Sequence, residues 1–420
     1  MSDFSIFLGG ENRVVLPFFA YPALSAKHIQ ANFIDSTIIG RVHDSFWLYK
    51  WKQRQVVGFW LLYRVYMCAE QASLPLHLVA DLVAGVASYN LFLRFLELYW
   101  VGPLVQDRQV YATMESLWID FWCCLRTFPK PAKKDTPELK KGQVKVYKKD
   151  KKFYHIILYL TGHMIVTDIV ASWAASFTGE EVQQMSVEKP AVFFVFFAFA
   201  TILLNDVFNC VGYSLHLFYC IFVEGGSYSS EQWRPLMINP VMSSSLDELW
   251  SHRWHQLFKS TWLAFPFRPV RILVERALTK RIKHAKSIAF LLASISVFVA
   301  SALMHEYVIA ANIGLPIYKR IFAGEQCLFF VGHGIGVFFE HLVHMLILPK
   351  LPESFKKSML YEILGHVWTA TFGYFTFYWI ANGFMSWGFQ FDNPLTFTKP
   401  YIVNFAQTHP RLLVNWGSHV

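Results

Sequence analysis

Long apolar runs separated by short polar connectors form the main pattern along the 420-residue chain. A helix that crosses a bilayer needs roughly 17–25 predominantly apolar residues, and six runs meet this length. They cover residues 74–101, 153–176, 191–223, 287–312, 327–348 and 363–385. Two shorter runs, residues 14–23 and 56–69, are interpreted as partial spans or interfacial helices. No strand pattern is evident, so the chain is predicted to be an all-α, polytopic membrane protein with about six to nine spans.

Composition supports the same class of protein. Hydrophobic residues make up 54% of the chain and charged residues only 16%, whereas charged residues make up about a quarter of a typical soluble domain. Aromatic residues reach 18% and suit contact with lipid and with the membrane interfaces. The first residues show no basic region followed by a small-residue cleavage site, so we expect the first spans to direct insertion.

The net charge of +9 comes largely from two connectors. Residues 130–152 hold ten Lys against three acids, and residues 268–286 hold seven Lys or Arg against one acid. Basic loops beside spans face the cytoplasm and attract anionic membrane lipid. Two spans separate these loops, which places both on the same side. Because the charge lies in loops and not across one face, nucleic acid is not expected as a partner.

Two parts of the chain are distinguished by this organisation. Residues 1–152 are predicted to hold N-terminal spans and a basic cytoplasmic loop, and residues 153–420 are predicted to form the functional core. Within the core, residues 224–286 form a long connector that is rich in Trp and Phe. Such a segment is expected to dock on the membrane face or to re-enter it partly.

His305 is the first candidate for chemistry. It follows eighteen uncharged residues, 287–304, and ionisable groups at membrane depth usually mark function. Histidine has an ordinary pKa of about 6.5, and burial keeps its ring neutral, so it suits a base that removes a hydroxyl proton. The alternative is a histidine that bonds a carbonyl of a neighbouring helix. Glu306 points about 100° away on the same helix, and its role stays open.

A second candidate lies in the connector, in the run "SLDELWSHRWHQLF" (residues 245–258). Its apolar positions recur at helical spacing, and Ser245 with Glu248 forms a plausible capping box. The run is therefore predicted to be one amphipathic helix in which His252, Arg253 and His255 are embedded. It is either an interfacial helix with a snorkelling Arg253 or a lid where a charged cytosolic molecule meets a lipid-side substrate.

Other polar residues lie inside spans. Asn205 and Asn209 share a helix face, and they either line a substrate chamber or make interhelical hydrogen bonds. His333, Glu340 and His344 share a face of another span. A polar tunnel wall is the favoured interpretation there, because a metal site needs three or four convergent ligands. The six cysteines show no metal-binding spacing, so no metal is predicted.

The connector carries a specific resemblance. The tract "INPVMSSSLDELWSHRWHQLFKSTWLAFPFRP" resembles the signature of the wax synthase branch of the membrane-bound O-acyltransferase superfamily, a segment of the form SL-x-x-FW-x-x-RWHQ. The later "SALMHEY" resembles the intramembrane histidine motif of the same superfamily. The specific resemblance covers residues 238–307. Leu249 stands where the family usually has Phe, and Ser251 stands where it usually has Gly.

The resemblance implies a multi-helix fold that encloses a tunnel, and transfer of an acyl group from acyl-CoA to a hydroxyl. It implies His305 as the base and His255 as a second catalytic residue, at a position where superfamily members often carry Asn. Residues expected to contact substrate are Asp247, Trp250, Arg253, Trp254, Glu306, Asn205, Asn209 and Glu340. Acyl-CoA is a co-substrate and no further cofactor is expected, because the CoA thiolate leaves readily.

The acceptor is expected to be a lipophilic alcohol, such as a long-chain alcohol, a sterol, a terpenoid or another secondary metabolite. The donor is either acetyl-CoA or a fatty acyl-CoA, and the endoplasmic reticulum is the expected location. Two alternatives remain open at this point. One is a proton-coupled transporter with a relay of acids and histidines. The other is a catalytically inactive member of the same fold.

Overall fold

The computed structural model describes residues 78–106, 119–120, 122–128, 147–391 and 396–408. The predicted short apolar runs at residues 14–23 and 56–69 lie outside the described residues, as does most of the basic loop at 130–152.

Helices form nearly all of the described structure, which confirms the all-α prediction. The longer helices are α3 (Leu78–Leu96), α5 (Phe153–Ala174), α6 (Gly179–Glu188), α7 (Pro190–Phe222), α10 (Arg268–Leu278), α11 (Ala285–Ile313), α12 (Leu315–Ile321), α13 (Glu325–Leu346), α15 (Met359–Trp387) and α16 (Lys399–Thr408). α3 continues directly into a wider π-helix, η2 (Glu97–Gln106). The strands β1 (Lys151–Lys152) and β2 (Ser227–Tyr228) form a two-residue antiparallel ladder.

Six of these helices fall at the six predicted spans. Four of them are long and apolar enough to cross a membrane: α5, α7, α11, and α13 with the turn that follows it. α3 and α15 are continuous helices at the other two predicted positions. The prediction of a polytopic membrane protein is thus confirmed, and the number of spans within the described part is at least four by length and composition.

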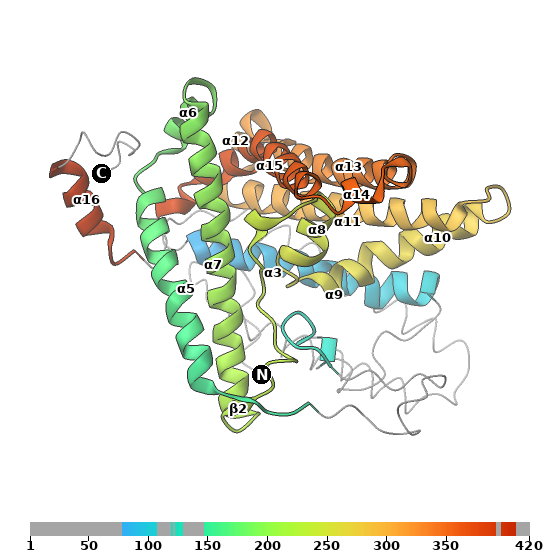
Figure 1. Ribbon diagram of the computed structural model, residues 1–420, viewed down its shortest axis with the longest axis horizontal. Coiled ribbons are helices and arrows are strands. Elements are labelled where there is room, and N and C mark those ends of the chain that lie inside the picture. Colours follow the sequence, from blue (N-terminus) through green and yellow to red (C-terminus); the bar gives the residue numbers. More distant parts are fainter. Residues whose placement is uncertain (1–77, 107–118, 121, 129–146, 392–395, 409–420) are drawn as a thin grey trace.

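The helices form two groups (Figure 1). α5 and α7 run side by side, joined at one end by α6 and held together at the other by the β1–β2 ladder. α11 packs against α10, α13 and α3, and α15 packs on α13. α6 and α7 both contact α15, and this connects the two groups.

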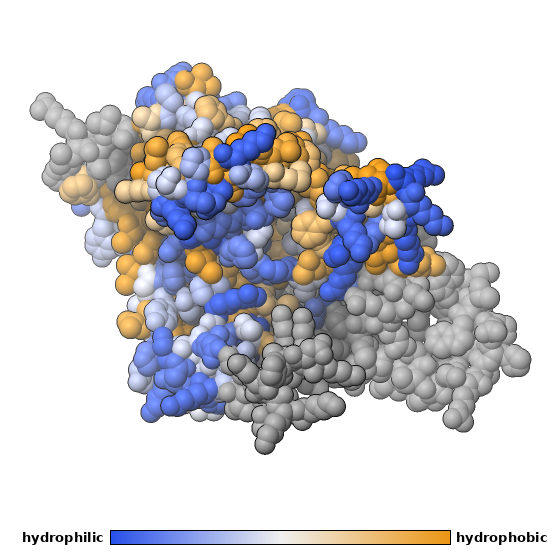
Figure 2. Space-filling view, turned by 45° about the vertical axis from the view of Figure 1, so that its right-hand side comes forward, coloured by the Kyte–Doolittle hydropathy of each residue, from blue (hydrophilic) through white to orange (hydrophobic). Residues whose placement is uncertain are grey.

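Many apolar side chains on the outer faces of the helices are exposed (Figure 2). Leu158 on α5, Phe222 on α7 and Phe375 on α15 are 70%, 72% and 71% exposed. A protein in water rarely leaves apolar surface uncovered over such an extent. Membrane lipid is the partner that these faces fit.

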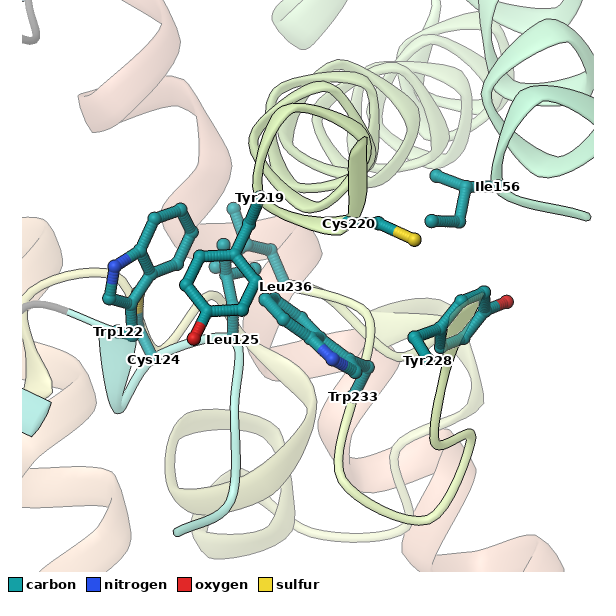
Figure 3. Packing of buried hydrophobic residues seen from close by; sticks show 9 residues of the cluster. All are labelled: Trp122, Cys124, Leu125, Ile156, Tyr219, Cys220, Tyr228, Trp233 and Leu236. Atoms are coloured by element: carbon teal, nitrogen blue, oxygen red, sulfur yellow. The ribbon is translucent and has the colours of Figure 1, made fainter. Parts of the chain in front are cut away.

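The connector between α7 and α10 is an ordered part of the core. Its first half packs Trp233 and Leu236 against Trp122, Leu125 and Tyr219 in a buried cluster (Figure 3). Its second half consists of short turns: η3 (Pro240–Met242), α8 (Leu246–Glu248), η4 (Leu249–Arg253), α9 (Lys259–Trp262) and η5 (Leu263–Phe267). The connector thus packs on the helical core, and the expectation that it docks on the membrane face or re-enters the membrane stays a prediction.

Candidate active site

His305 lies on α11 inside an aromatic enclosure. Its ring stacks on Phe330 of α13, with 4.4 Å between centroids and 25° between planes. Phe384 of α15 meets the same ring edge-on at 6.0 Å. The Nδ1 atom of His305 is buried and has no hydrogen-bond partner among the described residues. The alternative expectation is a hydrogen bond from His305 to a carbonyl of a neighbouring helix, and Nδ1 makes no such bond in the described residues.

His255 reaches the same place from the connector. Its ring stacks on Phe208 of α7 at 4.2 Å and meets Phe258 edge-on at 5.8 Å. Its Nδ1 is also buried without a partner in the described part of the chain. Desolvation lowers the pKa of His255 to about 4, so the ring is neutral at physiological pH. The two imidazoles, fifty residues apart in sequence, are near enough to interact electrostatically.

Two tryptophans complete the wall between the histidines. Trp250 lies 5.9 Å from Phe330 and 5.1 Å from Trp254, and Trp254 lies 5.8 Å from His255. The indole Nε1 of Trp250 is buried and finds no acceptor in the ranges that the structure describes. A buried donor without a partner costs about 1–3 kcal/mol, so such atoms call for a specific explanation. A polar group of a bound substrate would supply the missing partner.

The signature segment folds differently from the predicted single helix. Ser245 caps its start as expected, because its Oγ accepts a hydrogen bond of 2.9 Å from Glu248 N. The helix then widens into the π-turn η4, where Trp254 N donates to Leu249 O. Trp254 has an extended backbone and ends the helix, so the predicted continuation to Phe258 is wrong. The π-turn and the extended residue direct His255 toward α7, and the contacts it gains there override the helical pattern.

Arg253 and Glu248 fix this turn internally. Arg253 Nε donates to Glu248 Oε1 at 2.7 Å, and Arg253 Nη1 donates to Ile238 O at 3.2 Å. The second oxygen of Glu248 accepts from the backbone N and the Oγ of Ser244 at 2.8 and 2.7 Å. Burial by itself would raise the pKa of Glu248, but the bonds from Ser244 and Arg253 hold it below its ordinary value. The Arg253 head group is therefore held by the protein and does not snorkel to water. Ser245 still caps the helix, but the Glu248 side chain bonds Ser244 in place of the Ser245 backbone N that the capping box predicts.

Other residues expected to contact substrate are held by the protein itself. Asn209 accepts from Met237 N and donates to Met237 O, while Asn205 accepts from Asn239 N at 3.2 Å. Both asparagines thus join α7 to the start of the connector. The Asp247 carboxylate accepts from Ser251 Oγ at 3.1 Å.

Glu306, whose role the sequence left open, joins three helices. Its Oε2 accepts from Tyr318 Oη on α12 at 2.7 Å, and its Oε1 accepts from Cys327 N on α13 at 3.0 Å. The Glu340 carboxylate accepts hydrogen bonds from Leu246 N, Asp247 N and Trp368 Nε1. In the described residues no three His, Cys, Asp or Glu side chains converge closely enough to hold a metal ion.

The sequence did not single out Phe330, Phe208 or Phe384, which form the walls around the two histidines. Each lies in an apolar helix or at its edge, where phenylalanine also serves lipid contact and ordinary packing. No local pattern distinguishes a phenylalanine that stacks on a histidine from the many others in the chain.

Comparisons with known proteins agree with the predicted resemblance to membrane acyltransferases. The model of the membrane bound O-acyl transferase family matches residues 233–331, which include both histidines. The Arabidopsis thaliana protein named "Probable long-chain-alcohol O-fatty-acyltransferase 7" is 28% identical over 101 residues. That match spans 24% of this chain and 26% of the relative. No solved structure shows significant similarity.

Residues 233–331, which carry both histidines, are thus similar to membrane-bound O-acyltransferases. The two matches support the predicted resemblance to the wax synthase-like branch of that superfamily.

Proposed function

We propose that this protein transfers an acyl group from an acyl-CoA to the hydroxyl of a lipophilic alcohol, with His305 as the base. The observation that carries the proposal is a continuous set of ring contacts, through Phe330, Trp250 and Trp254, that connects His305 to His255. Both histidines have a buried Nδ1 without a partner in the described residues. A neutral imidazole offers one acceptor and one donor, which is what a general base requires.

The chemistry balances without a covalent enzyme intermediate. The hydroxyl oxygen attacks the thioester carbonyl as His305 removes its proton, and the carbon–sulfur bond then breaks. The CoA thiolate leaves and takes the proton from the imidazolium. Trp250 Nε1–H is a donor with no protein acceptor in the described residues, so it suits the carbonyl oxygen that becomes negative in the transition state. His255 orients the reactants from the opposite wall.

The substrate classes follow from the surroundings and the relative. The aromatic walls suit a lipophilic acceptor, and the relative's printed name points to a fatty acyl donor and a long-chain alcohol. Acetyl-CoA, sterols and terpenoids remain candidates within the same chemistry. The exposed cations around α10, such as Arg271 and Lys280, suit the phosphates of CoA on the cytoplasmic side. We also propose the endoplasmic reticulum membrane as the location.

The contacts of the buried acids support an enzyme over a proton-coupled transporter. Asp206 pairs with His163 across α5 and α7, and Asp168 accepts from Thr398 N at 3.2 Å. His333 Nδ1 bonds Phe329 O at 3.0 Å on its own helix. Each of these three groups thus already bonds a partner within the protein. A proton relay instead needs groups that can bond one neighbour and then the next as the proton moves.

The test is acyl transfer by membranes that carry equal amounts of wild type, His305→Ala or His344→Ala. Acetyl-CoA and palmitoyl-CoA are supplied separately with a panel of lipophilic alcohols, and both CoA thiol release and ester are measured. His344 is exposed near the end of α13 and serves as the matched histidine control. Alcohol-dependent ester formation that is lost only in His305→Ala supports the proposal. A folded wild type that forms no ester with any pair, or a His305→Ala variant with full rate, contradicts it.

A further inference from the structure

Glu340 of α13 makes a set of contacts that its place in an apolar helix does not explain. Its side chain is only 6% exposed, and both oxygens accept hydrogen bonds. Oε1 accepts from Leu246 N at 2.7 Å and from Trp368 Nε1 at 2.6 Å, and Oε2 accepts from Asp247 N at 2.9 Å. The first backbone N–H groups of a helix lack intrahelical acceptors, and a carboxylate there is stabilising. Glu340 therefore binds the beginning of residues 245–254, the signature turn, which consists of the capping residue Ser245, α8, η4 and Trp254.

The helices on both sides are shaped to receive this turn. A Cβ added at Gly336 of α13 would lie 2.6 Å from Leu246 Cδ1. A Cβ added at Gly365 of α15 would lie 2.4 Å from Ser244 O. Both distances are shorter than real Cβ contacts, so the turn sits directly against two glycine positions. Leu246 is completely buried there.

The far end of the turn is held from a different helix. Ile238 N donates to Arg253 O at 2.9 Å, and Arg253 donates back to Ile238 O. The residues before and after Ile238 are in turn held by α7, because Asn209 bonds Met237 and Asn205 bonds Asn239. Trp250 and His255 thus extend from a turn that α13 holds at its start and α7 holds at its end.

We propose that Glu340 is a positioning residue that sets Trp250 and His255 against His305. α13 carries both Glu340 and Phe330, the ring on which His305 stacks, so one helix supports both halves of the site. The kinetic part of this inference rests on the proposed function, and the structural part does not. Both oxygens of Glu340 already accept protein donors, which favours a positioning role over a contact with substrate.

The test compares Glu340→Gln with Glu325→Gln on the same helix. Glutamine keeps the shape of Glu340 but places an NH₂ group against a backbone donor, so at least one contact with the turn is lost. The Glu325 side chain accepts from Asn382 Nδ2 at 2.8 and 3.0 Å, and no hydrogen bond joins it to the signature turn in the described part of the chain. It is therefore a matched acid-to-amide control.

The first readout is amide hydrogen exchange of the full chain in nanodiscs, which needs no activity. Glu340→Gln should raise exchange in residues 245–256 by about tenfold or more, because a lost contact of about 1.4 kcal/mol corresponds to tenfold in the opening equilibrium. Glu325→Gln should leave that segment unchanged, and exchange in α11 should be unchanged in both variants.

The second readout is kinetic. Glu340→Gln should lower kcat by about 10–100-fold, as is typical for residues that orient a catalytic group, with the KM for acyl-CoA within about threefold. In a His255→Ala/Trp250→Phe background the same substitution should lower kcat by less than about threefold, because both groups that it positions are absent.

Unchanged exchange of residues 245–256 in Glu340→Gln would overturn the proposal. A raised KM at constant kcat would overturn it in favour of a substrate contact. A full additional loss in the His255→Ala/Trp250→Phe background would also overturn it. If the wild type transfers no acyl group at all, the proposed function fails, and hydrogen exchange alone decides whether Glu340 positions the turn.

Discussion

Two groups of polar side chains meet at the connector, and they differ in how their hydrogen-bonding atoms are used. In the first group, His305 Nδ1, His255 Nδ1 and Trp250 Nε1 are buried and have no partner within the described residues. In the second group the polar atoms bond the protein itself, and these side chains are Asn205, Asn209, Glu248, Arg253, Glu306 and Glu340. The first group lines the aromatic enclosure, and the second holds the connector and helices around it.

The difference separates chemistry from support. A buried polar atom without a partner is costly, so it persists where a ligand completes it or where reactivity requires it. A buried polar atom with partners lowers the free energy of the folded state and fixes geometry. Substitutions in the first group should therefore act on turnover, and substitutions in the second should act on stability or on the position of the connector.

The largest expected effect comes from His305→Ala. Removal of a general base costs about 10²–10⁴-fold in kcat, and the folded protein should keep its helices because no hydrogen bond of Nδ1 is lost. Initial rates of CoA thiol release at matched folded protein measure the loss, with His344→Ala as the control. A rate within threefold of wild type would show that the unpartnered nitrogen is not the base.

Two substitutions of His255 should lower turnover to different degrees. His255→Ala should lower kcat by about 10–10²-fold, because a group that orients the reactants is removed. His255→Asn should retain more activity than His255→Ala, since an amide also offers a donor and an acceptor and related enzymes often carry Asn there. Equal losses in the two variants would argue against a hydrogen-bonding role for this position.

Asn209 represents the supporting group. Its side chain both accepts from and donates to Met237, and it is 3% exposed. Asn209→Ala should lower the free energy of unfolding by about 1–3 kcal/mol, because it leaves the Met237 backbone groups buried without partners. Thermal unfolding in detergent measures the change, and exposed Asn404 on α16 provides the matched Asn→Ala control. No difference between the two variants would contradict a role for Asn209 in holding the connector.

The smallest effect is expected at the pair of Glu353 and Lys356. They form an ion pair of 2.6 Å within one short helix, α14 (Glu353–Lys356), and Glu353 is 73% exposed. Glu353→Ala should change stability by less than about 1 kcal/mol, and salt should screen what remains. A larger loss in thermal unfolding would mean that exposed pairs contribute as much as the buried contacts around the connector.

Much of the fold could be predicted because bilayer-length apolar runs leave few alternatives to helix. The expected span at 191–223 and the helix Pro190–Phe222 differ by one residue at each end. Residues 363–385 lie inside the longer helix Met359–Trp387, which begins earlier because Ser358 caps it. The hydropathy pattern cannot mark such a capped, more polar first turn.

The candidate site could be predicted only in part. Motif resemblance identified His305 and His255, and the structure brings them together. The end of the helix at Arg253 and the role of Glu340 were missed, because both depend on contacts with distant parts of the chain. Glu340 lies 94 residues after Leu246, and no local pattern in either segment indicates that they meet.

Neighbouring residues of α11 offer the most direct test of the central claim, since His305 belongs to the unpartnered group and Glu306 to the partnered group. The measurement is ester formation by His305→Gln and Glu306→Gln at equal amounts of folded protein, with the donor and alcohol that the wild type uses. The account predicts a loss of about 10²–10⁴-fold in His305→Gln and a rate within about threefold of wild type in Glu306→Gln. An equal loss in both variants, or full activity in His305→Gln, would contradict it.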